Sequence, residues 1–321
     1  MAVSVSAFTA MARKEFAQGK LAADEKPYPA NYEMFTANIS STARVETHTF
    51  LSNLPRLQRF KGYTSFARLI AKEYTIANEE YRVGLEVKKT DLDDDQVQMH
   101  LQTVNSLPNR AKKDVGHIIL DHLAAGTSRA CFDGSNFFAD SHTIGTGDNN
   151  IAVDNAGNDG VTHRIIALLV DNPVIKPVIF QDREPLSALQ TDADTPQAAL
   201  AKQYQYWVDG RFGMGYGFWW DAINVAITDT PSPAECYTII EAIINQFRSF
   251  TLPKGADVDD SLYVHEGWEP SNQNFVLCCN LKLGQILKRS MTISQYIAST
   301  GNVDNVYKDV ATIIPTSSLG A

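Results

Sequence analysis

The sequence predicts an α+β fold, and three features of it support this class. Two amphipathic strand patterns at 66–76 and 80–87 come first, a long helical pattern at 91–125 follows, and shorter strands and helices then alternate irregularly. A doubly wound parallel sheet would instead show regular alternation of strand and helix along the whole chain. With 321 residues, of which 44% are hydrophobic, the chain can bury a large core.

Residues 1–52 have the character of an arm rather than of a domain. A short helix is predicted at 7–18, and Pro27 and Pro29 favour extended backbone after it. The first residues lack the basic segment and long apolar run of a secretory signal. No stretch of the chain approaches the roughly 18 consecutive apolar residues of a membrane span, so we expect no membrane association.

The next region, 53–90, is predicted to contain a β-hairpin. Four large residues alternate there with polar residues or glycine, namely Tyr81, Val83, Leu85 and Val87. An earlier strand at 66–76 is expected to pair with this one through a turn near Asn78. Because two strands alone bury little apolar area, the hairpin must lie on another surface, such as that of a second copy of the chain.

A long amphipathic helix is predicted at 91–125. Acidic residues at 91–95 suit the positive end of a helix dipole, Pro108 predicts a kink, and Gly126 predicts the end of the helix. The same acidic residues do not form a calcium loop, because the glycine and the glutamate that an EF-hand requires are missing from their positions.

Shorter elements are predicted after this helix. Strands are expected at 165–170, 174–180, 261–264 and 310–314, and helices are expected at 274–288 and between Ser232 and Pro253. Ser232 begins a capping box, in which Pro233 and Glu235 follow it.

Glycines alternate with large residues at 213–217, which is typical of a strand crowded by neighbouring backbone. These glycines lack the spacing and the Lys-Ser/Thr ending of a phosphate loop, so no nucleotide cofactor is expected.

The segment 131–142 contains the most suggestive group of polar residues. Asp133, Asp140 and His142 carry oxygen and nitrogen ligands that divalent metals accept, and a metal-dependent hydrolase built on them is an alternative function. However, their spacing matches no closed metal signature, whereas Asp-Gly suits a tight turn and neighbouring phenylalanines anchor a loop in a core. We therefore expect no bound metal and a structural loop formed by Asp133, Gly134, Phe137 and Phe138.

Cysteine content and net charge argue against several other functions. The four cysteines include the neighbours Cys278 and Cys279, which is poor geometry for a disulfide or a metal knuckle, so we expect buried thiols. No cysteine or serine stands in the pattern of a catalytic nucleophile. A net charge of −9 predicts weak sequence-independent attraction to nucleic acid phosphates.

Several blocks of the sequence together resemble the Mu-like phage major head subunit family, gpT. They include Asn31 with Tyr32 and Phe35, and the segments 57–62, 77–81, 92–95, 132–142, 176–184 and 215–219. The resemblance covers most of residues 30–225 in scattered blocks. Each block is weak alone, but the set is specific.

The resemblance implies a Hong Kong 97-like capsid fold. On this basis residues 1–52 are the N-terminal arm, 53–90 the E-loop, 91–226 the P-domain with its spine helix at 91–125, and 227–321 the A-domain. In the family, blocks such as 176–184 lie near the C-terminus, whereas here about a hundred residues follow 215–219. This departure raises the hypothesis of a permuted order of the family's parts.

The resemblance also implies a function. The chain would be the major capsid protein of a tailed double-stranded DNA phage or prophage, assembling in the host cytoplasm into hexamers and pentamers of an icosahedral shell, without catalysis or cofactor. Scaffold, portal and decoration proteins would be partners, and the enclosed DNA would not be bound specifically. A phage tail protein is a second structural alternative. The residues expected to contact neighbouring subunits are Arg68, Lys72, Tyr74, Glu80, Tyr81, Arg82, Val83 and Glu86.

Overall fold

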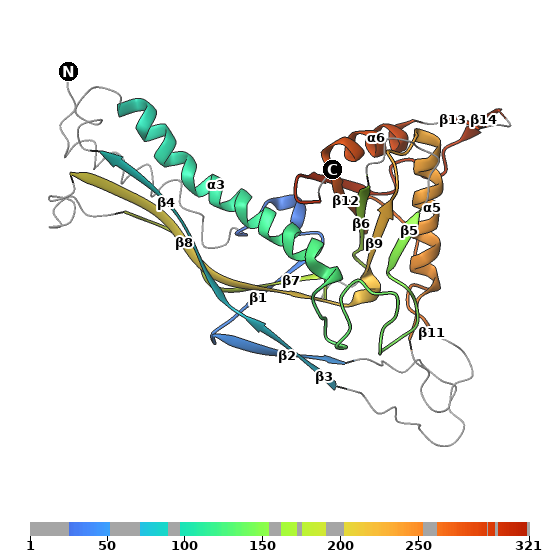
Figure 1. Cartoon of the computed structure of the whole chain (residues 1–321), viewed down its shortest axis with the longest axis horizontal. Coiled ribbons are helices and arrows are strands. Elements are labelled where there is room, and N and C mark those ends of the chain that lie inside the picture. Colours follow the sequence, from blue (N-terminus) through green and yellow to red (C-terminus); the bar gives the residue numbers. More distant parts are fainter. Residues whose placement is uncertain are drawn as a thin grey trace.

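The computed structural model describes most of the chain in nine segments. These are residues 26–51, 71–88, 97–153, 162–171, 175–190, 202–252, 262–293, 295–298 and 301–319. Two larger sheets organise them: a four-stranded sheet carries the long helix α3 along one face, and a five-stranded sheet with helices α5 and α6 forms a body beside the C-terminal end of α3 (Figure 1).

The four-stranded sheet has the order β1-β7-β8-β4. Its strands are β1 Thr36–Ser40, β7 Val178–Gln190, β8 Gln203–Tyr216 and β4 Glu79–Lys88, and only β1 and β7 are parallel. Alternate residues of β4 and β8 face the core, as the period of two predicts.

Helix α3, Val97–Ala124, covers the inner face of this sheet and contains Pro108 without ending there. The predicted long helix is confirmed, and the acidic residues at 91–95 lie outside the described part. The helix contributes one apolar stripe to the core: Val104, Leu107, Ala111, Val115, Ile119, Leu120 and Leu123.

The predicted strand pairing around Asn78 is wrong. Strand β3 (Ala71–Ala77) pairs with β2 (Val45–Leu51), while β4 pairs with β8. Asn78 is not the tip of a hairpin, because it is buried and its amide donates to the side chain of Ser41 and the carbonyl of Ala43. These bonds hold the point at which the chain passes from one pair of strands to the next. Alternation identified both strands correctly but carries no information about their partners.

Glycines in β8 make room for the hairpin β2–β3. A Cβ atom on Gly213 would stand 2.6 Å from the carbonyl oxygen of Ala77, and one on Gly215 would overlap the side chain of Ile76. The crowded-strand prediction is therefore confirmed. The base of the hairpin packs on its own chain, so this part does not need a second copy for support.

The five-stranded sheet has the order β15-β12-β6-β9-β5. Its strands are β5 Asn150–Val153, β6 His163–Leu169, β9 Ala222–Ile227, β12 Phe275–Asn280 and β15 Thr312–Thr316. The predicted strands at 165–170 and 310–314 are confirmed by β6 and β15. The strand predicted at 174–180 is β7, which begins at Val178 and runs much further.

Helices α5 (Pro233–Ser249) and α6 (Leu281–Thr292) pack beside this sheet. Ser232 and Glu235 form the predicted capping box. The helix predicted at 274–288 is partly wrong, because its first residues form the fully buried strand β12. A short apolar run does not distinguish a buried strand from a buried helix.

Short elements complete the described structure. They are η1 Ala30–Tyr32, η2 Ala125–Thr127, η3 Trp219–Asp221, β10 Thr251–Leu252, β11 Leu262–Tyr263, β13 Gln295–Ala298 and β14 Gly301–Asp304. Among the described helices, none is long and apolar enough to cross a membrane. The helix predicted at 7–18 lies outside the described residues.

Candidate functional site

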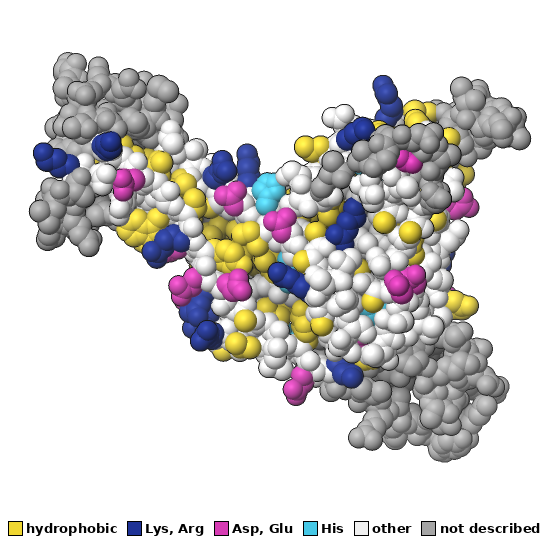
Figure 2. All heavy atoms as spheres, in the orientation of Figure 1, with side chains coloured by type: hydrophobic (Ala, Val, Ile, Leu, Met, Phe, Trp, Pro, Cys, Tyr) yellow, Lys and Arg dark blue, Asp and Glu magenta, His cyan; other side chains and the backbone are white. Residues whose placement is uncertain are grey.

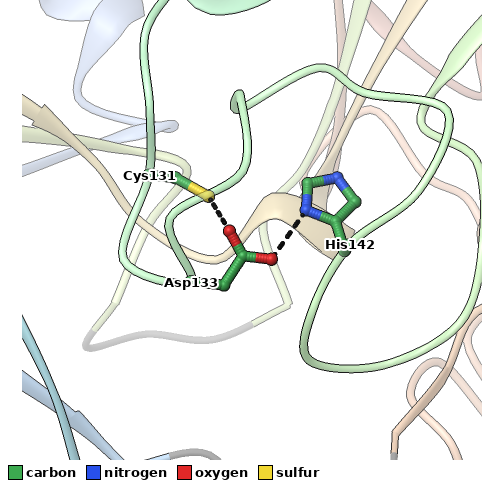
Figure 3. A group of neighbouring side chains, drawn as sticks. All are labelled: Cys131, Asp133 and His142. Atoms are coloured by element: carbon green, nitrogen blue, oxygen red, sulfur yellow. Dashed lines mark hydrogen bonds and ion pairs between the residues drawn. The ribbon is translucent and has the colours of Figure 1, made fainter.

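The polar group predicted in 131–142 lies in the loop between α3 and β5. Asp133 stands between Cys131 and His142 (Figure 3). Its Oδ1 accepts from the Cys131 thiol at 3.0 Å, and its Oδ2 lies 3.0 Å from Nδ1 of His142. The side chains of Asp133 and His142 are both 0% exposed. The loop therefore buries a charged pair away from water.

Two backbone amides complete the environment of Asp133. Ser135 donates to Oδ1 at 2.9 Å and Thr143 donates to Oδ2 at 3.1 Å. Burial raises the pKa of Asp133, but hydrogen bonds from His142, Cys131 and Ser135 outweigh it and lower the pKa to about 2. Gly134 takes a φ of +88°, a backbone conformation that favours glycine in a tight turn.

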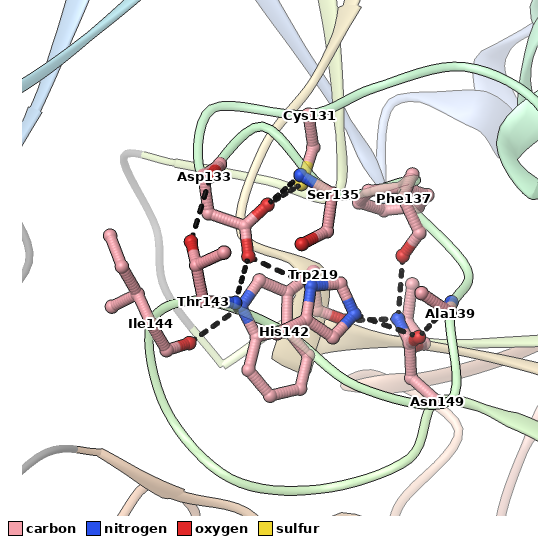
Figure 4. A network of polar contacts seen from close by, with 11 residues as sticks. Cys131, Asp133, Ser135, Phe137, Ala139, His142, Thr143, Ile144, Asn149 and Trp219 are labelled. Atoms are coloured by element: carbon pink, nitrogen blue, oxygen red, sulfur yellow. Dashed lines mark hydrogen bonds and ion pairs between the residues drawn. The ribbon is translucent and has the colours of Figure 1, made fainter.

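Asn149 fixes the charge state of His142 (Figure 4). The Nδ2 of Asn149 faces the carbonyl oxygens of Phe137 and Trp219, at 2.7 and 3.0 Å, so its Oδ1 must be the atom 3.1 Å from Nε2 of His142. Nε2 therefore donates, and Nδ1 also faces an acceptor, the carboxylate of Asp133. With both nitrogens donating, His142 is an imidazolium.

An aromatic ring covers this imidazolium. The rings of His142 and Trp219 are parallel, with centroids 3.9 Å apart, which is the arrangement of a cation–π contact. The indole Nε1 of Trp219 donates to the carbonyl of Ile144 at 3.1 Å. Trp219 thus connects η3 to the second half of the loop.

Two phenylalanines hold the loop against the core. Phe137 stacks on Tyr216 of β8, with centroids 4.3 Å apart, and Phe138 is buried against Gly126. A Cβ on Gly126 would stand 2.7 Å from the Phe138 ring, so this glycine permits the close approach. The loop as a whole fixes how the chain leaves α3 and enters the five-stranded sheet.

The alternative metal constellation of Asp133, Asp140 and His142 does not form. Asp140 is exposed and accepts from the Nδ2 of Asn150 at 3.2 Å instead of joining Asp133 and His142. Cys131 takes its place in the group, and its thiol pKa is raised by burial and by Asp133, which keeps the sulfur protonated. Because four donors already bind the carboxylate of Asp133, the arrangement is suited to a structural role and not to metal binding.

Sequence reasoning missed Cys131, Asn149 and Trp219 as members of this loop. Cys131 could have been found from its spacing of two to Asp133. Asn149 lies in the same loop, seven residues after His142, whereas Trp219 lies more than seventy residues later and only the fold brings it to the loop. All four cysteines are free and buried, as predicted.

The residues predicted to contact neighbouring subunits fall into two groups. Glu80, Arg82 and Glu86 lie on the exposed face of β4, where Arg82 forms an ion pair with Asp209 at 3.1 Å. By contrast, Tyr81 stacks on Phe212 of the same chain, with centroids 4.2 Å apart.

The remaining members lie on or near β3 and β4. Val83 and the half-buried Tyr74 pack against the core of their own chain, and Lys72 is partly buried on β3. Arg68 lies outside the described residues. The contacts of this set with other subunits stay a prediction.

Comparison with known proteins gives a consistent result. The family model for the Mu-like prophage major head subunit gpT matches residues 5–246. The Mu-like prophage FluMu major head subunit of Haemophilus influenzae is 31% identical over 198 residues, which are 60% of this chain and 64% of that protein, less than two thirds of its length. The major capsid protein of Escherichia phage Mu is 26% identical over 228 residues, 69% of this chain and 73% of that protein.

Solved structures support the fold. The match with the protein in the procapsid of bacteriophage JBD30 covers 98% of this chain and 98% of that one, with a TM-score of 0.68 and 23% identity. In the JBD30 capsid the TM-score is 0.68 at 17% identity, over 93% of this chain and 94% of that one. The predicted α+β capsid fold of the Hong Kong 97-like type is thus confirmed. Since the family model spans well over half of the sequence, the chain belongs to the Mu-like prophage major head subunit family, gpT, whose members are structural capsid proteins and not enzymes.

Proposed function

We propose that this chain assembles with copies of itself into hexamers and pentamers of an icosahedral phage head that encloses double-stranded DNA. The observation that carries the proposal is the platform of α3 and the four-stranded sheet. Within the described residues, this platform extends away from the five-stranded body, and the face of β4 that points away from α3 is exposed (Figure 1). Such a thin two-layer extension suits a subunit that covers area in a shell and completes its contacts through neighbours.

The open face of β4 is the proposed source of polar contacts between subunits. Glu80, Arg82 and Glu86 of this face would meet neighbouring chains, together with Lys72 of β3 and with Arg68 beyond the described residues. Tyr74, Tyr81 and Val83 would support them from below, because these three residues pack against their own core. Many copies of modest contacts then give a stable shell.

The division of the chain into parts is also a proposal. We retain the arm 1–52, the E-loop 53–90, the P-domain 91–226 and the A-domain 227–321. The five-stranded sheet takes β5, β6 and β9 from the third part and β12 and β15 from the fourth. The proposed P-domain and A-domain therefore share a core, and the boundary at 226 separates them only along the sequence.

The surface charge is compatible with a container. Over the face in Figure 2, basic and acidic side chains are interspersed and form no large basic field. With a net charge of −9, the protein would enclose DNA without binding its phosphates strongly. Assembly in the host cytoplasm, with scaffold, portal and decoration proteins as partners, is part of the same proposal.

Electron microscopy of the expressed, purified chain tests this function. We expect closed shells or isolated capsomers. Rings or tubes would instead favour a tail protein, and dispersed monomers at all concentrations would contradict self-assembly. Elemental analysis of the same sample should find no stoichiometric metal, whereas one bound ion per chain would revive the hydrolase alternative.

A further inference from the structure

Strand β4 is a long open edge. One side of it pairs with β8 over Glu79–Lys88, and within the described part of the chain no strand pairs with the other side (Figure 1). Its ten residues include no proline and so can donate backbone hydrogen bonds along the free edge. An edge of this length is a template for a strand from another chain.

The charges on the exposed face of β4 are arranged symmetrically about Gly84. Arg82 and Glu86 stand two residues on either side of it, and Glu80 and Lys88 stand four residues on either side. At each distance the two members of the pair have opposite charge. A strand with this pattern is complementary to itself when it is turned end to end.

We propose that two copies of this chain pair antiparallel along β4, about a two-fold axis that passes through Gly84. This inference rests on the proposed self-assembly. In that register Glu80 lies opposite Lys88 of the second copy, and Arg82 lies opposite its Glu86. On the inner face the apolar residues also meet, with Tyr81 opposite Val87 and Val83 opposite Leu85. A two-fold contact requires such self-complementarity.

The proposed contact creates two rows of charged side chains that run across β8, β4 and the β4 strand of the second copy. The first half of each row, from β8 to β4, already exists within one chain. On β8, Asp209 forms an ion pair with Arg82 at 3.1 Å, and Arg211 lies 4.0 Å from Glu80. The second copy extends the first row with Glu86 and the second row with Lys88. Both rows then alternate in sign across the two sheets, so no like charges become direct neighbours.

The second copy explains why position 84 is a glycine, whereas contacts within the chain do not. A Cβ at this position would meet only ordinary contacts, the nearest being the carbonyl oxygen of Tyr206 at 3.5 Å. A glycine inside a strand nevertheless reduces its stability and often marks a place where another backbone approaches closely.

Cysteine cross-linking tests the register. Opposite residues of antiparallel strands have Cα atoms about 5 Å apart, within the roughly 4.4–6.8 Å range of a disulfide. Assembled G84C should therefore give a dimer on non-reducing electrophoresis, about tenfold more than E86C, which is a matched control on the same face. R82C mixed with E86C should also cross-link, although neither should do so alone. The native cysteines are buried and add little background.

Charge reversal gives an independent test if G84C assembles poorly. K88E should reduce shell yield, because it places a second carboxylate opposite Glu80 of the other copy. The variant E80K/K88E/R211E should restore the yield, because it reverses both sides of the contact and keeps residues 80 and 211 opposite in charge. A control, K113E, changes the same charge on the exposed face of α3 and should assemble normally. Normal shells in which G84C does not cross-link and K88E has no effect would overturn the two-fold pairing while leaving self-assembly intact. Absence of wild-type shells would instead refute the proposed function.

Discussion

Asp133 links the stability of the subunit to pH. Its pKa is about 2 in the fold, against an ordinary value near 4 in the unfolded chain. The depressed pKa contributes stability, of about 2 kcal/mol, that is fully present above pH 4 and is lost as the pH falls towards 2. Urea denaturation of the unassembled subunit between pH 5 and pH 2 should show this loss.

The variant Asp133→Asn isolates the contribution of the carboxylate. At neutral pH it leaves the imidazolium of His142 buried without its counter-ion, so we expect a loss of about 3 kcal/mol. The part of the acid dependence due to Asp133 should disappear. The exposed Asp140→Asn is the control and should change stability by less than about 0.5 kcal/mol. Equal behaviour of the two variants would show that the buried pair has no special role.

Local and distant members of this loop differ in how well the sequence predicts them. The turn at Gly134 and the anchors Phe137 and Phe138 follow from their own short segment, where turn chemistry and hydrophobicity suffice. Trp219 reaches His142 from η3, more than seventy residues later in the chain. No spacing rule encodes that contact, because it depends on how β8 returns past the end of α3.

At the scale of elements, the glycines of β8 give a sharp stability prediction. Gly213→Ala places a Cβ 2.6 Å from the carbonyl oxygen of Ala77, so β3 must shift, and we expect a loss of about 1–3 kcal/mol in denaturation of the unassembled subunit. Gly84→Ala is the matched control in the same sheet, because its Cβ meets only ordinary contacts. A Gly213→Ala subunit as stable as Gly84→Ala would show that the two strands are not closely packed.

The hairpin β2–β3 allows the E-loop proposal to be tested without damaging the subunit. Leu51 and Ala71 are paired, so a two-residue Asn-Gly turn can replace 52–70 and close the hairpin. We expect the shortened chain to keep its circular dichroism spectrum and denaturation midpoint but to lose shell assembly in electron microscopy. Normal shells would show that 52–70 makes no essential contact. A scrambled sequence of the same length is the control for loop length.

Element types were predictable, but strand partners were not. The patterns for α3, β4, β6 and α5 carry clear periods, and capping at Ser232 marks a helix start. The pairing of β4 with β8 joins segments over a hundred residues apart, and either of two amphipathic strands could have been its partner. In the sequence, only the glycines at 213 and 215 indicated that another strand, β3, packs closely against β8.

At the scale of the whole molecule, Arg164 joins the platform to the body. From β6 it donates through Nη1 to the carbonyl of Ala124 at 2.7 Å, at the C-terminal end of α3, and through Nε to Asn224 of β9. It also lies over the ring of Phe138, 5.8 Å from the centroid. A cation at a helix C-terminus is favourable, so one side chain fixes the helix to the sheet and to the loop that follows it.

Replacement of Arg164 should loosen that junction. Arg164→Met keeps much of the apolar stem but leaves the carbonyl of Ala124 and the amide oxygen of Asn224 without this donor. We expect the unassembled subunit to lose about 2 kcal/mol, with faster hydrogen exchange at the end of α3 and in the loop around Asp133. Arg110→Met, on the exposed face of α3, is the control and should leave both measurements unchanged. If exchange rises only within β6, then Arg164 stabilises its own strand and the platform is held to the body by other contacts.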